Sequence, residues 1–194
     1  METIIILLVL SYLLGSTPFS LLIGLWFYKI DLRQHGSGNI GTTNTFRILG
    51  KKAGIVVLLL DMFKGALPVV AAMLLNVDMH IFIPGLVAAL GHVYSIFLKF
   101  KGGKAVATSA GAVLAYNPLL FIMLLAAFLI TLKLSKYVSL SSIVSAVLFF
   151  ILSLAFRDPL LIAFSFIIAV VIVVRHISNI KRIMDGTESK ITFM

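Results

Sequence analysis

Lys99-Phe-Lys-Gly-Gly-Lys-Ala-Val-Ala-Thr108 is a polar segment between two strongly apolar stretches of the chain. Its two adjacent glycines let the backbone come close to a ligand, and its three lysines bring positive charge. The apolar run that follows predicts a helix whose free N–H groups and dipole favour an anion. The segment therefore indicates a phosphate-binding loop at a membrane surface. The same lysines are also explained as cytoplasmic topology charges beside a helix.

The composition of the chain is that of an integral membrane protein. Hydrophobic residues make up 61% of the 194 residues and charged residues only 12%, which is more apolar than a soluble domain requires. The net charge is +9, but the bases lie in short connecting segments, so they indicate topology and anionic partners rather than nucleic acid. The absence of cysteine excludes disulfides, thiolate metal sites and a cysteine nucleophile.

Seven apolar runs predict an all-α integral membrane protein, a bundle of seven transmembrane helices in a single domain, residues 1–194. The runs cover roughly residues 2–28, 53–75, 80–98, 104–116, 117–134, 138–156 and 159–175. The fourth helix is short, about 20 Å, and Asn117-Pro118 separates it from the fifth. Its glycine-rich start is expected to dip below the cytoplasmic surface and line a polar cavity.

The distribution of lysine and arginine predicts the orientation of this bundle. With seven helices, nearly all basic loops share one side and only Arg157 falls on the other. The positive-inside rule then places the N-terminus outside and the C-terminus in the cytoplasm. The first apolar run lacks a basic n-region, so we expect a spanning helix there and not a cleaved signal peptide.

A second phosphate-type segment lies in the longest predicted polar loop, residues 29–52. It contains His35-Gly-Ser-Gly-Asn-Ile-Gly-Thr-Thr-Asn44, followed by Arg47. Glycines among small hydroxyl and amide side chains can form a backbone nest, and the arginine can bind a phosphate bidentately. Such loops are also commonly plain turns. Two phosphate-type loops on one face favour the functional interpretation.

Several polar residues fall inside apolar runs. Asp61 and Lys64 are three apart and face one another on a helix, either as a functional pair or as an ion pair that stabilises packing. His92 is either a ligand contact or part of an interhelical hydrogen bond. Gly15-Ser-Thr-Pro18 marks a helix-packing notch or a kink, and we expect packing.

The last polar segment follows the seventh apolar run, Arg175-His-Ile-Ser-Asn-Ile-Lys-Arg182 and then Asp185-Gly-Thr-Glu188. On a continued helix His176 and Asn179 are at i and i+3, so a polar patch could face the two loops. The alternative is a basic juxtamembrane segment that binds anionic lipid.

Three stretches together resemble one family, the bacterial membrane glycerol-3-phosphate acyltransferases that use acyl phosphate (PlsY). The stretches are Ser37-Gly-Asn-Ile-Gly-Thr-Thr-Asn44, Gly91-His92 through Phe100-Lys-Gly-Gly-Lys-Ala-Val-Ala-Thr108, and Arg175-His176 through Asn179 to Gly186-Thr-Glu188. The resemblance spans essentially the whole chain. Four positions depart from the family pattern: Thr42 stands where the family often has Ala, Ala105 where Gly is common, Ser95 where Pro is usual and Ser20 where Gly is frequent. Of these only Ala105 touches the phosphate loop.

The resemblance implies transfer of a fatty acyl group from acyl phosphate to the 1-hydroxyl of glycerol 3-phosphate, the first step of bacterial phospholipid synthesis. It implies a multi-pass protein of the cell inner membrane with its active site on the cytoplasmic side, no cofactor, no metal and no obligatory protein partner. Catalytic roles are implied for Ser37, Arg47, Lys104, His176 and Asn179. Substrate contacts are expected from Gly38, Asn39, Thr42, Thr43, Asn44, His92, Lys101, Gly102, Gly103, Thr108 and Lys181. Structural roles are expected for Asp61, Lys64 and Glu188.

The motifs of other chemistries are missing. No His-x4-Asp pair, Gly-x-Ser-x-Gly elbow, full Gly-x4-Gly-Lys-Ser/Thr loop or carboxylate cluster for a metal occurs in the sequence. We therefore expect direct transfer in which the substrate phosphate accepts the hydroxyl proton, with His176 as the rival base. The alternative functions are a transporter of a small phosphorylated anion, a lipid head-group phosphotransferase and a non-catalytic lipid-binding scaffold.

Overall fold

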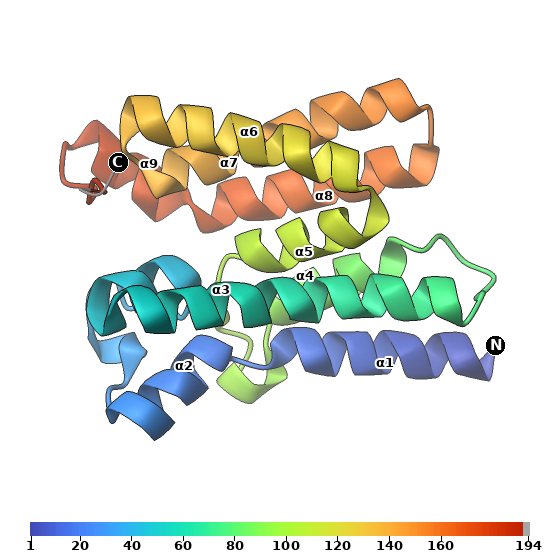
Figure 1. Ribbon diagram of the computed structural model, residues 1–194, viewed down its shortest axis with the longest axis horizontal. Helices are drawn as coiled ribbons and strands as arrows, with labels where there is room; N and C mark the ends of the chain where they lie inside the picture. Colours follow the sequence, from blue (N-terminus) through green and yellow to red (C-terminus); the bar gives the residue numbers. More distant parts are fainter. Residues whose placement is uncertain (192–194) are drawn as a thin grey trace. The chain divides into compact units, whose positions relative to one another are not determined.

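The computed structural model describes residues 1–191, which form helices and connecting turns without any strand (Figure 1). The chain divides into two compact units, one ending at Tyr116 and the other beginning at Asn117. The all-helical prediction is confirmed for the described residues. The break predicted at Asn117-Pro118 is also confirmed, because Asn117 caps the helix that starts at Pro118.

The first unit contains five α-helices and three short turns of other helix types. The α-helices are α1 (Glu2–Ser16), α2 (Phe19–Ile23), α3 (Thr42–Leu74), α4 (Ile83–Val93) and α5 (Val106–Tyr116). The short turns are a π-helix, η1 (Gly24–Tyr28), and two 3₁₀ turns, η2 (Leu32–Gln34) and η3 (Ile96–Leu98). Within the unit α5 packs on α3, and α1 packs on α4.

The helix predicted to run over residues 2–28 is broken. It ends at Ser16, Thr17 is extended (ψ 119°), and the axis bends by 45° before α2 continues. Pro18 explains the break, because proline lacks an N–H and disfavours helical geometry in the residue before it. The predicted packing notch is also present: a Cβ at Gly15 would lie 2.1 Å from the Ala88 carbonyl oxygen.

The predicted polar loop 29–52 is shorter in the structure, because α3 already begins at Thr42. Arg47 therefore lies on a helix and not in a loop. Polar side chains do not prevent a helix, and the first helix-incompatible backbone is at Gly50, where φ is 84° and ψ is −177°. Gly50 kinks α3 instead of starting it, since glycine adopts such angles without steric cost.

The contact between α3 and α5 depends on small residues. A Cβ at Gly65 would lie 1.9 Å from the Thr108 carbonyl oxygen, and a Cβ at Gly111 would lie 1.9 Å from the Met62 carbonyl oxygen. Two helix backbones approach this closely only where side chains are absent, which is a common way to pack helices in a membrane. The contact fixes the start of α5, and with it the segment just before it, relative to α3.

In the second unit the described residues, 117–191, form four α-helices: α6 (Pro118–Ser135), α7 (Val138–Ser153, extended by a 3₁₀ turn, η4, Leu154–Phe156), α8 (Pro159–Arg175) and α9 (Ile177–Met184). Helix α7 packs on α6 and on α8. The chain bends by 52° at His176, between α8 and α9. The continued helix expected through this region is therefore interrupted.

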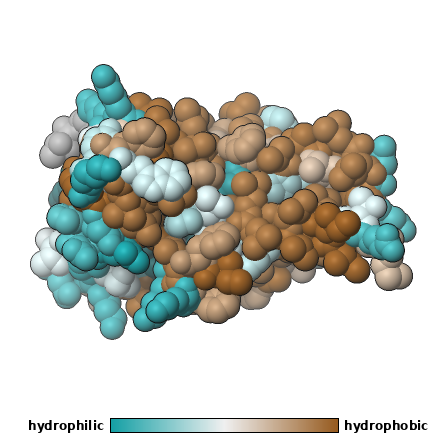
Figure 2. Space-filling model, turned by 90° about the horizontal axis from the view of Figure 1, so that it is seen from below, coloured by the Kyte–Doolittle hydropathy of each residue, from teal (hydrophilic) through white to brown (hydrophobic). Residues whose placement is uncertain are grey.

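The helices suit a bilayer. Three are long and apolar enough to cross one, and the number rises to five if each bent pair counts as one span; residues 83–98 and 106–116 are shorter. Beyond its first turn the exposed side chains of α1 are all apolar, and on the face shown in Figure 2 apolar surface dominates while hydrophilic residues gather toward the ends. This pattern is expected where the middle of the protein contacts lipid.

Candidate functional site

The first polar segment is folded around the side chain of Asn44, which is 1% exposed. Its Oδ1 accepts a hydrogen bond from the Ser37 N–H at 3.0 Å. Its Nδ2 donates to the carbonyl oxygens of Leu32 at 3.3 Å and His35 at 3.0 Å. The Asn44 side chain thus holds the backbone of the segment that contains Ser37. A contact between Asn44 and substrate stays a prediction.

Several other side chains of the segment are more exposed than Asn44. Ser37, Thr43 and Arg47 are exposed, and Asn39 and Thr42 are half-buried. Gly36 and Gly38 have positive φ, 61° and 69°, as the predicted nest requires. The segment therefore presents a hydroxyl and a guanidinium on a backbone that is held from within.

A charged pair supports the same segment. Arg33 donates to both carboxylate oxygens of Asp31, with the shortest distance 2.6 Å. The hydrogen bond from Arg33 holds the pKa of Asp31 below its usual value. The pair closes the turn in which η2 lies.

The lysine-glycine segment is arranged differently from the prediction. Gly102 and Gly103 are buried, and their N–H groups donate to the carbonyl oxygens of Val93 at 2.9 Å and His92 at 3.0 Å. These hydrogen bonds do not support an anion contact through the two N–H groups. The glycines instead let the segment lie against the end of α4. An anion contact by Lys104, which is half-buried, stays a prediction, and so does one by the first turn of α5, where N–H groups lack intrahelical partners.

Ala105 lies just after Lys104 with φ at 57°. This left-handed conformation costs an L-residue roughly 1–2 kcal/mol, whereas glycine adopts it freely. The family's usual glycine at this position therefore fits the backbone better than the alanine here. The backbone at Ala105 nevertheless adopts the left-handed conformation that a glycine there would adopt.

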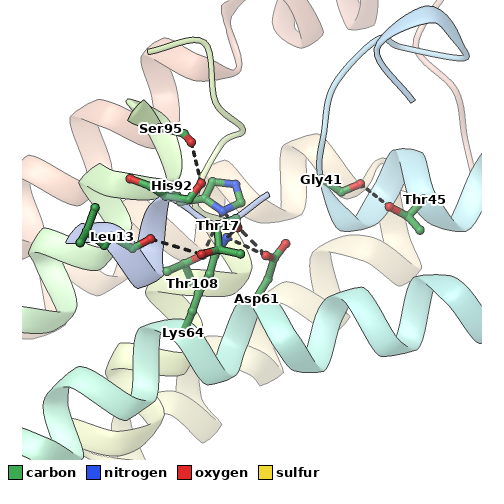
Figure 3. A network of polar contacts seen from close by, with 10 residues as sticks. Leu13, Thr17, Gly41, Thr45, Asp61, Lys64, His92, Ser95 and Thr108 are labelled. Carbon is green, nitrogen blue, oxygen red and sulfur yellow. Dashed lines mark hydrogen bonds and ion pairs between the residues drawn. The ribbon is translucent and has the colours of Figure 1, made fainter. Parts of the chain in front are cut away.

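A buried polar network lies beside this segment (Figure 3). Asp61 and Lys64 form an ion pair at 2.8 Å, and their side chains are only 3% and 1% exposed. Lys64 also donates to the Thr17 carbonyl oxygen at 2.9 Å, an acceptor released by the break before α2. Ser95 also contacts this break, since its hydroxyl donates to the Ser16 carbonyl oxygen at 2.5 Å. The ion pair left open by the sequence is present, and the structural role of Asp61 and Lys64 stays a prediction.

His92 connects the network to the lysine-glycine segment. Its Nδ1 lies 3.2 Å from the Thr108 hydroxyl and 3.9 Å from a carboxylate oxygen of Asp61. Thr108 is fully buried and His92 is 8% exposed, so the interhelical hydrogen bond left open by the sequence is present. Asp61, Lys64 and His92 adjoin a narrow recess that leaves essentially no room for a water molecule. Substrate contacts by His92 and Thr108 stay predictions.

In the second unit a single carboxylate, that of Glu188, accepts hydrogen bonds from three side chains. Glu188 Oε1 accepts from Asn179 at 2.6 Å and from Ser139 at 2.8 Å, and Oε2 accepts from Arg182 at 2.7 Å. Partial burial raises the pKa of Glu188, but these hydrogen bonds outweigh it and the pKa lies below its usual value. Glu188 thereby holds the side chain of Asn179 on α9, and its structural role stays a prediction.

His176 lies at the bend between α8 and α9 and is 3% exposed. Its Nδ1 lies 2.8 Å from the Ile172 carbonyl oxygen. A carbonyl only accepts, so Nδ1 carries the proton in the neutral ring, and Nε2 is the atom able to take one. Lys181 is exposed on α9. Among the described residues no group of three His, Cys, Asp or Glu side chains could hold a metal ion.

Sequence comparison identifies the family. The profile described as glycerol-3-phosphate acyltransferase matches residues 5–186. The chain belongs to this family. A glycerol-3-phosphate acyltransferase of Macrococcus caseolyticus is 50% identical over 98% of both chains, and one of Geobacillus kaustophilus is 50% identical over 96% of this chain and 95% of its own.

Solved structures of the acyltransferase family agree with the fold. The glycerol 3-phosphate form of PlsY (YgiH), an integral membrane glycerol 3-phosphate acyltransferase, matches with a TM-score of 0.90 at 36% identity, over 97% of this chain and 95% of that one. The lysophosphatidic acid form matches with a TM-score of 0.86. The resemblance read from the three sequence stretches is thereby confirmed, and so is the assignment to an enzyme family of acyltransferases.

The structure distributes the family's signature residues over both units. Ser37, Arg47 and Lys104 belong to the first unit, and His176 and Asn179 belong to the second. Sequence reasoning missed Ser16 and Ser95, which meet at the broken helix. No spacing rule signals them, because their contact depends on how α1 packs beside the end of α4.

Proposed function

We propose that this chain is a glycerol-3-phosphate 1-O-acyltransferase that uses acyl phosphate and forms lysophosphatidic acid and phosphate. Membership of the acyltransferase family carries the proposal. The absence of a nucleophile elbow and of a His-x4-Asp pair supports acyl phosphate as donor, because that donor is already activated and needs mainly to be positioned.

The reacting ends of both substrates carry phosphate, and two phosphates held close together repel one another. Cations and N–H donors must offset this repulsion. Arg47, Lys104 and the first turn of α5 supply them on the first unit. We further propose that Ser37 donates or accepts a hydrogen bond to substrate, and that His176 and Asn179 have catalytic roles.

The transfer itself needs no acyl-enzyme. The 1-hydroxyl oxygen forms a bond to the acyl carbon, the bond between that carbon and the phosphate oxygen breaks, and its electron pair leaves on phosphate. The hydroxyl proton passes to a phosphate oxygen of the substrate. The rival base is Nε2 of His176, whose ordinary pKa suits proton transfer near neutral pH.

We propose seven membrane crossings, with the short α4 and α5 regions counted as crossings together with the three long helices and the two bent pairs. The N-terminus is then outside and the C-terminus cytoplasmic, in the bacterial inner membrane, with the reaction on the cytoplasmic side. The acyl chain enters from the bilayer, and no obligatory protein partner is required. Single cysteines at positions 37 and 104 should both react with a cytoplasmic reagent.

Initial rates of lysophosphatidic acid formation by purified variants test the roles of these residues. Arg47→Gln removes a guanidinium contact, and we expect kcat/KM to fall about 100-fold, the loss of roughly 3 kcal/mol. Lys52→Gln is the matched control: it removes an exposed cation from the same helix and should change the rate less than about threefold. Equal rates for both variants would contradict the assignment.

His176→Gln separates the two proposed bases. If phosphate is the base, the variant keeps a measurable kcat, because only a positioning contact is lost. A fall of several orders of magnitude in kcat at unchanged KM and unchanged thermal stability would instead establish His176 as the base.

A further inference from the structure

The path of the lysine-glycine segment follows the ring of His92. A Cβ built on Gly103 would lie 2.2 Å from His92 Nε2, and its next neighbours are also atoms of that ring. A Cβ built on Gly102 would instead lie 2.0 Å from the His92 carbonyl oxygen and 2.6 Å from that of Val93. Gly103 therefore packs against a side chain, the ring of His92, whereas Gly102 packs against the backbone of His92 and Val93.

The ring is held on its other side. The Thr108 hydroxyl lies 3.2 Å from Nδ1, and Asp61 lies 3.9 Å from the same atom. Asp61 is in turn fixed by Lys64, which donates to the carbonyl oxygen of Thr17 and lies 5.6 Å from the centre of the Phe19 ring. Figure 3 shows three helices converging here: α4 carries His92, α5 carries Thr108, and α3 carries both Asp61 and Lys64. The ring thus has little freedom to move away from Gly103.

We propose that His92 is a positioning residue: its imidazole ring is the template against which Gly103 packs, and it thereby places Lys104 and the start of α5 for the phosphate of glycerol 3-phosphate. The inference rests on the proposed function for its ligand, but the packing itself does not depend on it. His92 acts through the backbone of the loop and needs no contact with substrate.

A double-mutant cycle tests this template. Gly103→Ala introduces a methyl group where the ring stands, so it should lower the melting temperature and raise KM for glycerol 3-phosphate with a smaller effect on kcat. His92→Ala removes the ring and makes room for that methyl. The KM increase of the double variant should therefore be at least about tenfold smaller than the product of the two single-variant increases, which corresponds to a coupling of about 1.4 kcal/mol.

Gly102→Ala is the matched control. Its added methyl meets backbone carbonyl oxygens, which His92→Ala leaves in place. The effects of Gly102→Ala and His92→Ala should therefore multiply in KM and add in melting temperature. If His92 contributed only to general stability, the coupling between positions 92 and 103 would equal the coupling between positions 92 and 102.

The outcomes separate this inference from the proposed function. Coupling in melting temperature between positions 92 and 103, absent between 92 and 102, supports the template whether or not the protein transfers acyl groups. Equal behaviour of the two cycles overturns it, even if the wild-type protein is fully active. Coupling in stability with no coupling in KM, in an active enzyme, also overturns the claim that the ring places the phosphate site.

Discussion

Replacing Asn44 by alanine should destabilise the protein strongly, because one buried side chain organises the whole segment that carries Ser37. The substitution removes three hydrogen bonds, one accepted from Ser37 and two donated to Leu32 and His35. Each contributes about 1 kcal/mol. Leu32 is fully buried, so water cannot easily replace the lost donor there. We expect a loss of about 3 kcal/mol in the free energy of unfolding.

For a chain of this length 1 kcal/mol corresponds to roughly 2–4 °C, so the melting temperature of Asn44→Ala should fall by about 6–12 °C. The fluorescence of Trp26, the one tryptophan of the chain, reports the transition in detergent. Asn39→Ala is the matched control. The Asn39 backbone N–H donates a hydrogen bond to the Ser37 hydroxyl, and this bond survives the substitution, so the shift of the melting temperature should stay below about 2 °C. Equal shifts in both variants would refute the organising role of Asn44.

Three further changes test other parts of the structure. Lys64→Met leaves the buried Asp61 carboxylate uncompensated and should cost about 3–5 kcal/mol, while adding Asp61→Asn should restore much of the melting temperature. Glu188 has a folded-state pKa below its unfolded value, so its contribution to stability is complete above the unfolded pKa and is lost as pH falls through the folded pKa. Glu188→Gln should therefore weaken the dependence of the melting temperature on pH below about pH 4.5, relative to wild type. Asp31→Asn removes another carboxylate with a lowered pKa and serves as the comparison. Gly111→Ala should separate α3 from α5 and lower the melting temperature by several degrees, at a cost of about 1–3 kcal/mol.

The sequence was informative where a residue acts through local chemistry. Apolar runs predict the helices, Asn117-Pro118 predicts the break between α5 and α6, and the i, i+3 spacing predicts the ion pair of Asp61 and Lys64. Each of these depends on neighbours within a few positions along the chain. The same reasoning explains why the family resemblance could be recognised in three short stretches.

The sequence was less informative where tertiary contacts decide the outcome. The polar residues before Gly50 were expected in a loop, yet they form the start of α3 because their backbone groups are satisfied by a helix. Gly102 and Gly103 were expected to offer N–H groups to an anion, yet α4 accepts their hydrogen bonds. His176 was expected on a continuous helix, yet the chain bends there. No periodicity distinguishes these alternatives, because each depends on which element packs against the segment.

The most direct test of the account is acyl transfer by the purified protein to labelled glycerol 3-phosphate. Acyl phosphate, acyl-CoA and acyl carrier protein thioester are offered as donors in parallel reactions. The account predicts labelled lysophosphatidic acid with acyl phosphate and none with the two thioesters. Product formed only from a thioester would contradict the activated-donor mechanism, and no product from any donor would contradict the proposed function itself.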